Sequence, residues 1–195
     1  MNAGIITIGD ELIQGFTSDT NSKWLSKKLN QYNIKTHSII TIGDDRLSIN
    51  ASLNTFLLNY NLEYVFITGG LGPTHDDITK KILSEYFNKK LDVDEKYLLK
   101  LNNTYKKSNH IIENVNIVKQ LESQATFIRG SIPIFNRNGT ALGMLINHKK
   151  IKIFVLPGVP EEMKTMFDNE IIPKYLPTKK NNLINYITIR TTGAY

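Results

Sequence analysis

YVFITGGLGPTHDDITKKILSEYF, residues 64–87, is the stretch of sequence that decides the fold. It begins with an apolar run, Tyr64–Thr68, that is typical of a buried strand, and apolar residues recur at helical spacing between Ile78 and Phe87. The strand and the helix are separated by a loop that contains Gly69, Gly70 and Gly72. A strand, a glycine-rich loop and a helix in this order predict one unit of an α/β protein.

The same alternation of strand and helix precedes this unit. An apolar run at residues 3–8 and a stretch rich in β-forming residues at 34–42 predict two further strands, and apolar residues at helical spacing follow them at residues 24–32 and 49–60. Parallel strands joined by helical crossovers form a sheet that helices cover on both faces. The predicted fold class is therefore α/β with a mostly parallel sheet.

The second half of the chain turns to strands. After a helix that Asp94 caps and a polar loop at 106–116, four runs predict strands, at residues 126–128, 132–135, 142–147 and 151–156. We expect the last two to form an antiparallel hairpin that joins the sheet. Pro160 is placed to open a helix that Pro173 and Pro177 end, and a linker then leads to a lone strand at residues 186–192.

The composition excludes several classes of protein. The 195 residues include no Cys, so a disulfide scaffold, a Cys-ligated zinc site and a thiol nucleophile are excluded. Lys and Arg number 24 against 18 Asp and Glu, but the lysines are scattered in pairs, which is typical of solvated helix faces, and we expect no nucleic-acid partner. No apolar stretch approaches the length of a membrane span, and the N-terminus lacks the pattern of a signal peptide. We therefore expect a soluble cytoplasmic protein.

Pairs of acidic residues follow three of the predicted strands. They are Asp10 with Glu11, Asp44 with Asp45, and Asp76 with Asp77. Loops that follow parallel strands emerge at one edge of the sheet, where open α/β proteins bind ligands. An Asp in this position also serves as the N-cap of the next helix, but one acid is enough for a cap. Three pairs at one edge therefore favour a functional site over capping alone, in which a divalent cation or a raised pKa in one acid would relieve the repulsion.

The loop at Thr68–Asp77 is the most specific local feature. Its three glycines allow backbone amides to approach phosphate oxygens, while aspartates at the start of the next helix would hold a metal ion. The loop is neither a Walker motif nor a GxGxxG dinucleotide motif. Candidate ligand-binding residues are those of this loop and of two later turns: Gly69, Gly70, Gly72, Thr74, Asn136, Thr140 and Glu161.

Six stretches occur in one order along the chain: IGDELIQG (8–15), DTNSKWL (19–25), TIGDD (41–45), TGGLGPTHDDITK (68–80), NRNGTALG (136–143) and LPGVPEEMKTMF (156–167). Together they resemble the N-terminal domain of the CinA (competence/damage-inducible protein A) family, part of the molybdopterin-binding MoaB/MogA-like superfamily. The resemblance implies a three-layer α/β/α domain over residues 1–176 and a homodimer. Longer members continue into a KH-like domain and a nicotinamide-nucleotide amidohydrolase domain. By this resemblance, residues 177–195 are a linker and the first strand of the KH-like domain, and the amidohydrolase domain is absent.

The resemblance also implies an activity. CinA-like domains are associated with metal-dependent hydrolysis of ADP-ribose to AMP and ribose 5-phosphate, and the family's metal-linked aspartates fall on Asp44 and Asp77. Two positions depart from the family pattern: Leu142 replaces a frequent Pro, and Ser123 replaces a frequent basic residue that would neutralise phosphate.

These observations lead to the hypothesis of an ADP-ribose pyrophosphatase. Asp44, Asp76 and Asp77 would hold Mg²⁺, Mn²⁺ or Co²⁺, and the candidate catalytic residues are Asp44, Asp77, Asp10 and Glu11. The partner would be a small nucleotide resembling ADP-ribose. Two alternatives stay open. One is a protein that binds or adenylylates molybdopterin, and the other is a non-catalytic nucleotide-binding module.

Overall fold

A computed structural model describes residues 1–73, 78–107, 115–178 and 192–193 of the chain. Its centre is a sheet with the strand order β2-β1-β3-β8-β7-β6. The strands are β1 (Asn2–Ile8), β2 (Lys35–Ile42), β3 (Tyr64–Thr68), β6 (Ile132–Ile134), β7 (Gly143–His148) and β8 (Ile151–Leu156). The pairs among β2, β1, β3 and β8 are parallel, whereas β7 pairs antiparallel with β8 and with β6. The mostly parallel sheet and the predicted hairpin are confirmed.

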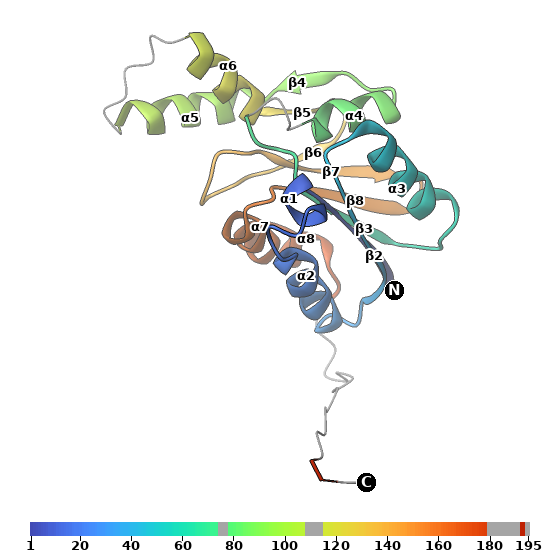
Figure 1. Ribbon diagram of the computed structural model, residues 1–195. Helices are drawn as coiled ribbons and strands as arrows, with labels where there is room; N and C mark the ends of the chain where they lie inside the picture. Colours follow the sequence, from blue (N-terminus) through green and yellow to red (C-terminus); the bar gives the residue numbers. More distant parts are fainter. Residues whose placement is uncertain (74–77, 108–114, 179–191, 194–195) are drawn as a thin grey trace.

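Helices cover both faces of this sheet (Figure 1). One face carries α2 (Thr20–Asn30), α7 (Pro160–Met166), a π-helical segment (Phe167–Ile171) and α8 (Ile172–Tyr175), and the other carries α3 (Arg46–Leu58) and α4 (Thr79–Tyr86). A short helix, α1 (Asp10–Ile13), follows β1 directly. The fold is therefore the three-layer α/β/α arrangement that the resemblance implied.

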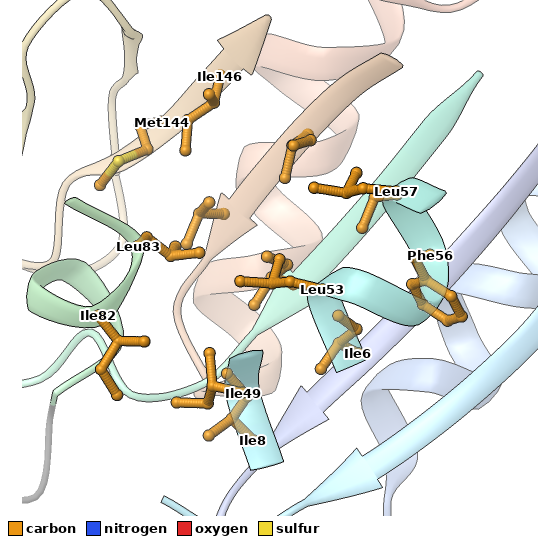
Figure 2. Packing of buried hydrophobic residues seen from close by; sticks show 14 of the residues in the cluster. Ile6, Ile8, Ile49, Leu53, Phe56, Leu57, Ile82, Leu83, Met144 and Ile146 are labelled. Atoms are coloured by element: carbon orange, nitrogen blue, oxygen red, sulfur yellow. The ribbon is translucent and has the colours of Figure 1, made fainter. Parts of the chain in front are cut away.

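The core is divided by the sheet because successive side chains of a strand point to opposite faces. In β3, all of whose residues are buried, Val65 and Ile67 pack with α3 and α4, whereas Tyr64 and Phe66 pack with α2 and α7. Figure 2 shows the first of these clusters, in which Leu53 and Leu83 lie close to the apolar side chains of the sheet. Burial on both faces explains why this strand reads as an unbroken apolar run.

A small extension is built on the second half of the chain. It contains α5 (Glu95–Lys107), α6 (Val115–Gln124) and a two-stranded antiparallel sheet of β4 (Leu91–Val93) and β5 (Thr126–Ile128). Its own apolar cluster includes Tyr97, Leu101 and Leu121. The sequence patterns predicted α5 and β5 but neither β4 nor α6.

Two expectations need correction. The polar stretch at 106–116 is not all loop, because α5 extends to Lys107 and α6 begins at Val115. Pro173 does not end the helix that Pro160 opens, because it lies in the first turn of α8, where its missing N–H is tolerated.

Most of the predicted strand at 186–192 lies outside the described residues. Among the described helices, none combines the length and the apolar character that crossing a membrane would require.

Candidate functional site

The carboxyl ends of the parallel strands bring four connecting segments together. In the register of the sheet, Thr7 of β1 lies beside Thr41 of β2 and Thr68 of β3, and Thr68 lies beside Leu156 of β8. At this edge the structure contains a cavity of about 410 Å³. It is lined by residues from every one of these connections and from the extension: Ile8, Gly9, Glu11, Asp44, Gly69, Gly70, Leu71, Gly72, Pro73, Gln124, Thr140, Ala141, Pro157, Gly158, Val159 and Glu162.

Two glycines give the loop after β3 its shape. Gly69 has a φ of 114° and Gly70 a φ of 65°, both in the region that favours glycine. A Cβ atom on Gly69 would lie 2.0 Å from the carbonyl oxygen of Ile8, and one on Gly70 would lie 2.0 Å from the Oγ1 atom of Thr79. The cavity wall at this point therefore consists of backbone, as a close approach to phosphate oxygens requires.

The acidic residues of the first two connections are joined by a reciprocal pair of hydrogen bonds. The backbone N–H of Asp10 donates to Oδ2 of Asp44 over 3.1 Å, and the backbone N–H of Asp44 donates to Oδ1 of Asp10 over 3.0 Å. Asp44 and Glu11 line the cavity, whereas Asp10 does not line it and instead holds Asp44. The structure thus brings together two of the predicted acidic residues at the cavity and supports one of them with a third.

The neighbour of Asp44 has a different role. Asp45 is the N-cap of α3, and its Oδ1 accepts a hydrogen bond from the backbone N–H of Ser48 over 2.9 Å. The hydrogen bonds from the Ser48 side chain and backbone lower the pKa of Asp45. Of this acidic pair, one residue faces the cavity and the other caps a helix, so the capping interpretation holds for Asp45. The predicted residues Thr74, Asp76 and Asp77 lie outside the described part of the chain.

A buried glutamine connects the extension to the glycine-rich loop. Gln124, at the end of α6, donates from Nε2 to the carbonyl oxygen of Leu71 over 3.1 Å, and its Oε1 accepts from the hydroxyl of Thr140 over 3.0 Å. Both Gln124 and Thr140 line the cavity. The predicted site residue Thr140 is therefore at the cavity, and Gln124 is a site residue that the sequence analysis missed.

Asn136 lies behind the cavity rather than in its wall. It is fully buried, and its side-chain Nδ2 donates to the carbonyl oxygen of Ala141 and to Oε2 of Glu162. The hydroxyl of Tyr97 donates to its carbonyl oxygen, and burial raises the pKa of Tyr97 to about 12, so this hydroxyl keeps its proton at physiological pH. Asn136 therefore positions other groups of the site.

The structure places Glu162, not Glu161, at the cavity. The side chain of Glu161 is 78% exposed and forms an ion pair with Lys164, and Glu161 is absent from the cavity lining. Glu162 lines the cavity and accepts the hydrogen bond from Asn136. The acidic residue of α7 that lines the cavity is therefore Glu162, one residue after the predicted Glu161.

A second, smaller cavity adjoins the first. Its volume is about 260 Å³, and it shares Ile8, Glu11, Gly158 and Val159 with the larger one. The segment Asp19–Asn21 forms part of its wall: Asp19 caps α2 through the N–H of Ser22, and the amide of Asn21 donates to the hydroxyl of Thr68 and to the carbonyl oxygen of Gly158. The two cavities therefore meet at Glu11 and the loop after β8.

A buried cation lies behind the glycine-rich loop. Lys80, in the first turn of α4, is 6% exposed, and its Nζ donates to the carbonyl oxygen of Ser123 over 2.7 Å. Ser123 is the position at which the resemblance described above leads us to expect a basic residue. The buried Lys80 ammonium group thus supplies a positive charge next to that position.

The turn that carries Asn136 and Thr140 is fastened to the helices beside it. Asn138 donates from Nδ2 to the hydroxyl of Thr165 in α7 over 2.9 Å. Arg137 forms an ion pair with Glu170 of the π-helical segment, and Glu170 also pairs with Lys174. These contacts fix the turn against the same helix that contributes Glu162 to the cavity.

Glu170 predicts a specific dependence of stability on pH. Burial raises the pKa of this carboxyl, but the hydrogen bonds and charges of Lys174 and Arg137 outweigh burial, so the pKa lies below its ordinary value of 4.5. A lowered folded-state pKa gives stability that is present above pH 4.5 and is lost as the pH falls through the folded-state pKa. We expect Glu170→Gln to lower the free energy of unfolding at pH 7 by about 1–2 kcal/mol, because it removes the charge that pairs with Arg137 and Lys174. The loss is no larger because both cations are largely exposed and water screens them. Urea unfolding at pH 7 and between pH 3 and 5 measures both effects.

Asp168→Asn is the matched control for Glu170→Gln. Asp168 belongs to the same segment, but its side chain is 41% exposed where it pairs with Lys28. We expect this variant to keep the wild-type loss of stability in acid. An equally steep loss in Glu170→Gln would contradict the prediction.

The fold and the site define an α/β ligand-binding domain, with a glycine-rich loop and acidic residues at the carboxyl edge of its sheet. The chain belongs to the family described as "Probable molybdopterin binding domain", which matches residues 4–176. Within it, the chain is a domain of the CinA N-terminal type.

Two relatives illustrate the match. The chain is 40% identical over 199 residues to a CinA-like protein of Flavobacterium psychrophilum, covering 100% of this chain and 45% of that protein. It is 39% identical over 176 residues to Protein TK1472 of Thermococcus kodakarensis, covering 89% of this chain and 70% of that protein. The chain therefore spans about half the length of the CinA-like relative.

Solved structures agree with the fold. The crystal structure of the protein CinA from Thermoplasma acidophilum matches with a TM-score of 0.72 at 29% identity, over 86% of this chain and 94% of that one. The molybdopterin biosynthesis enzyme MoaB from Thermus thermophilus matches with a TM-score of 0.56 at 14% identity, over 88% of this chain and 89% of that one. At this identity the second likeness concerns the fold alone.

Proposed function

We propose that this chain binds a phosphorylated ligand of the nucleotide or molybdopterin type in the 410 Å³ cavity. The observation that carries the proposal is the pair of left-handed glycines, Gly69 and Gly70, whose backbone forms the wall beside Asp44. The N–H of Gly69 donates to the carbonyl oxygen of Leu156, so the amides that suit phosphate oxygens are those of the residues after it. The volume is within the range of small-molecule sites.

The donor chemistry of the site suits a divalent cation. An oxygen of Asp44 would lie 3.4 Å from a Cβ on Gly70, so this carboxylate is next to the expected phosphate position. In residues 1–73, 78–107 and 115–178, no group of three His, Asp or Glu side chains is arranged to hold an ion. Asp44 would therefore hold the cation together with phosphate oxygens, water or residues outside those ranges. A divalent cation there would neutralise phosphate charge.

As the reaction, we propose hydrolysis of the diphosphate bond of ADP-ribose to AMP and ribose 5-phosphate. Support comes from the three carboxylates that line one cavity with the glycine-rich loop, Glu11, Asp44 and Glu162. Carboxylates repel phosphate unless a cation lies between them, and a cation bound there would also lower the pKa of an attacking water molecule. Glu11, which lines both cavities, would orient a water molecule by accepting its hydrogen bond.

Calorimetry and product analysis test the binding and the reaction separately. The purified chain is titrated with AMP, ADP-ribose and molybdopterin, with and without Mg²⁺, and AMP release from ADP-ribose is followed by chromatography with Mg²⁺, Mn²⁺ or Co²⁺. We expect metal-dependent binding of ADP-ribose and release of AMP. Binding without release under every metal would leave a non-catalytic module, and tight binding of molybdopterin alone would favour pterin chemistry. No binding of any of the three would overturn the proposed function.

A further inference from the structure

The carboxylate of Glu162 is held in one orientation before any ligand binds. One of its oxygens, Oε2, accepts a hydrogen bond from Nδ2 of Asn136, a fully buried side chain. Glu162 itself is half-buried in the first turn of α7 and lines the cavity. A carboxylate with one oxygen occupied in this way can present the other to a ligand.

The orientation of the Asn136 amide is forced by its neighbours. Its Oδ1 accepts a hydrogen bond from the backbone N–H of Asn138 over 3.0 Å, and its Nδ2 donates to the carbonyl oxygen of Ala141. A backbone N–H can only donate and a carbonyl can only accept, so the amide cannot be turned around. The Nδ2 group therefore always donates toward position 162, and the side chain at that position has to accept the hydrogen bond.

Gly139 leaves the space in which this carboxylate lies. A Cβ atom on Gly139 would lie 2.0 Å from Cδ of Glu162 and 2.3 Å from each of its oxygens. Any larger residue would push the carboxylate away, while the fold could adapt because the obstructing atoms end a flexible side chain. The turn thus fixes the position of the Glu162 carboxylate in two ways, through the hydrogen bond from Asn136 and through the space at Gly139.

We propose that Glu162 binds a neutral hydrogen-bond donor of the ligand, either sugar hydroxyls or the amino edge of a heterocycle, and so fixes the direction in which the ligand lies. This rests on the proposed function, in which the phosphate contacts the loop at Gly69 and Gly70. An acceptor-only carboxylate repels phosphate and attracts O–H and N–H groups. The phosphate end and the donor-bearing end of the ligand therefore occupy different parts of the cavity.

Glu162→Gln tests this polarity directly. The Asn136 amide demands an acceptor, so the glutamine must turn its carbonyl oxygen toward Asn136 and its NH₂ group toward the ligand. The substitution keeps the shape and reverses the hydrogen-bond polarity at the cavity. We expect the affinity for AMP in the presence of Mg²⁺ to fall roughly 10- to 100-fold, whereas the affinity for inorganic pyrophosphate does not fall, because the substitution removes a charge that repels phosphate.

Two further variants provide the controls. Glu161→Gln removes the adjacent, exposed acid and should leave both affinities unchanged. Gly139→Ala keeps the charge of Glu162 but displaces it, and should weaken AMP binding as Glu162→Gln does. Thermal unfolding of each variant shows whether it is folded before it is titrated.

Titration with a second ligand shows whether the hydrogen-bond donor that Glu162 binds belongs to the sugar or to the base. Titration with 2′,3′-dideoxy-AMP removes the sugar hydroxyls. If the wild type and Glu162→Gln then bind equally, the donor is the sugar, and if the difference persists, it is the base. Equal AMP affinity of the wild type and Glu162→Gln, or an equal loss for AMP and pyrophosphate, would overturn the inference while leaving the proposed function standing. A wild type that binds none of AMP, ADP-ribose and molybdopterin would instead mean that the proposed function itself has failed.

Discussion

Replacement of Gly69 by alanine is expected to abolish ligand binding and to lower the free energy of unfolding by about 3 kcal/mol or more. Two effects combine. The φ of 114° is unfavourable for any residue with a side chain, and the new Cβ would lie 2.0 Å from the carbonyl oxygen of Ile8. That oxygen belongs to the backbone at the end of a central strand, so it cannot move aside, and the loop has to be displaced from the cavity.

Gly15→Ala is the matched control because it separates the two effects. Gly15 has a φ of 76°, but nothing lies within 4 Å of a Cβ atom there. We expect this variant to lose only about 1 kcal/mol, from backbone strain, and to bind ligand normally. Urea unfolding gives the stabilities and calorimetry the affinities. Similar losses in the two variants would show that the approach of Gly69 to Ile8 is not the cause.

The second large effect is expected for Asp44→Asn. The asparagine side chain keeps an oxygen that can accept the hydrogen bond from the backbone of Asp10, so the fold should persist, but the charge that would hold a divalent cation is lost. We expect the Mg²⁺-dependent affinity for ADP-ribose, and any turnover of it, to fall by at least about 100-fold. Calorimetry at several Mg²⁺ concentrations measures the change.

Asp45→Asn removes an equal charge from the adjacent position. Asn is as good an N-cap as Asp, so α3 keeps its first turn, and Asp45 does not line the cavity. We expect ligand affinity close to that of the wild type. If the two variants weakened binding equally, the effect would come from the general electrostatic field rather than from a specific contact of Asp44.

The sequence predicted those site residues whose position depends only on the strand that precedes them. Gly69 and Gly70 follow the fully buried strand β3, and Asp44 lies just after β2, so the topology alone brings them to one edge. Gln124 could not be found in this way. Its role depends on how α6 docks against the glycine-rich loop, and the contact with Leu71 joins residues 53 positions apart.

The choice between Glu161 and Glu162 is different, because the sequence did contain the signal. Met163 and Met166 mark the inner face of α7, and each residue of a helix advances by about 100° around its axis. Glu162 is therefore at the margin of the buried face, whereas Glu161 is nearly opposite to it. Helical phase, applied to the first turn, would have selected Glu162.

The elements that were missed are short or atypical. β4 has only three residues, too few to give a strand pattern in the sequence, and its pairing with β5 is decided by the tertiary structure. Pro173 was expected to end a helix, but the backbone passes through a π-helical turn, Phe167–Ile171, and starts a new helical turn in which a proline is allowed. A periodicity of 3.6 residues cannot register such a change of helix type.

The reciprocal hydrogen bonds between Asp10 and Asp44 affect the entropy of binding. Each carboxylate accepts a hydrogen bond from the other residue's backbone N–H, so the protein itself fixes both side chains. A side chain that must be immobilised on binding costs about 0.5–1.5 kcal/mol, and here folding has already met that cost. The acidic edge of the sheet is therefore preorganised, and a cation or ligand that arrives there meets a rigid surface.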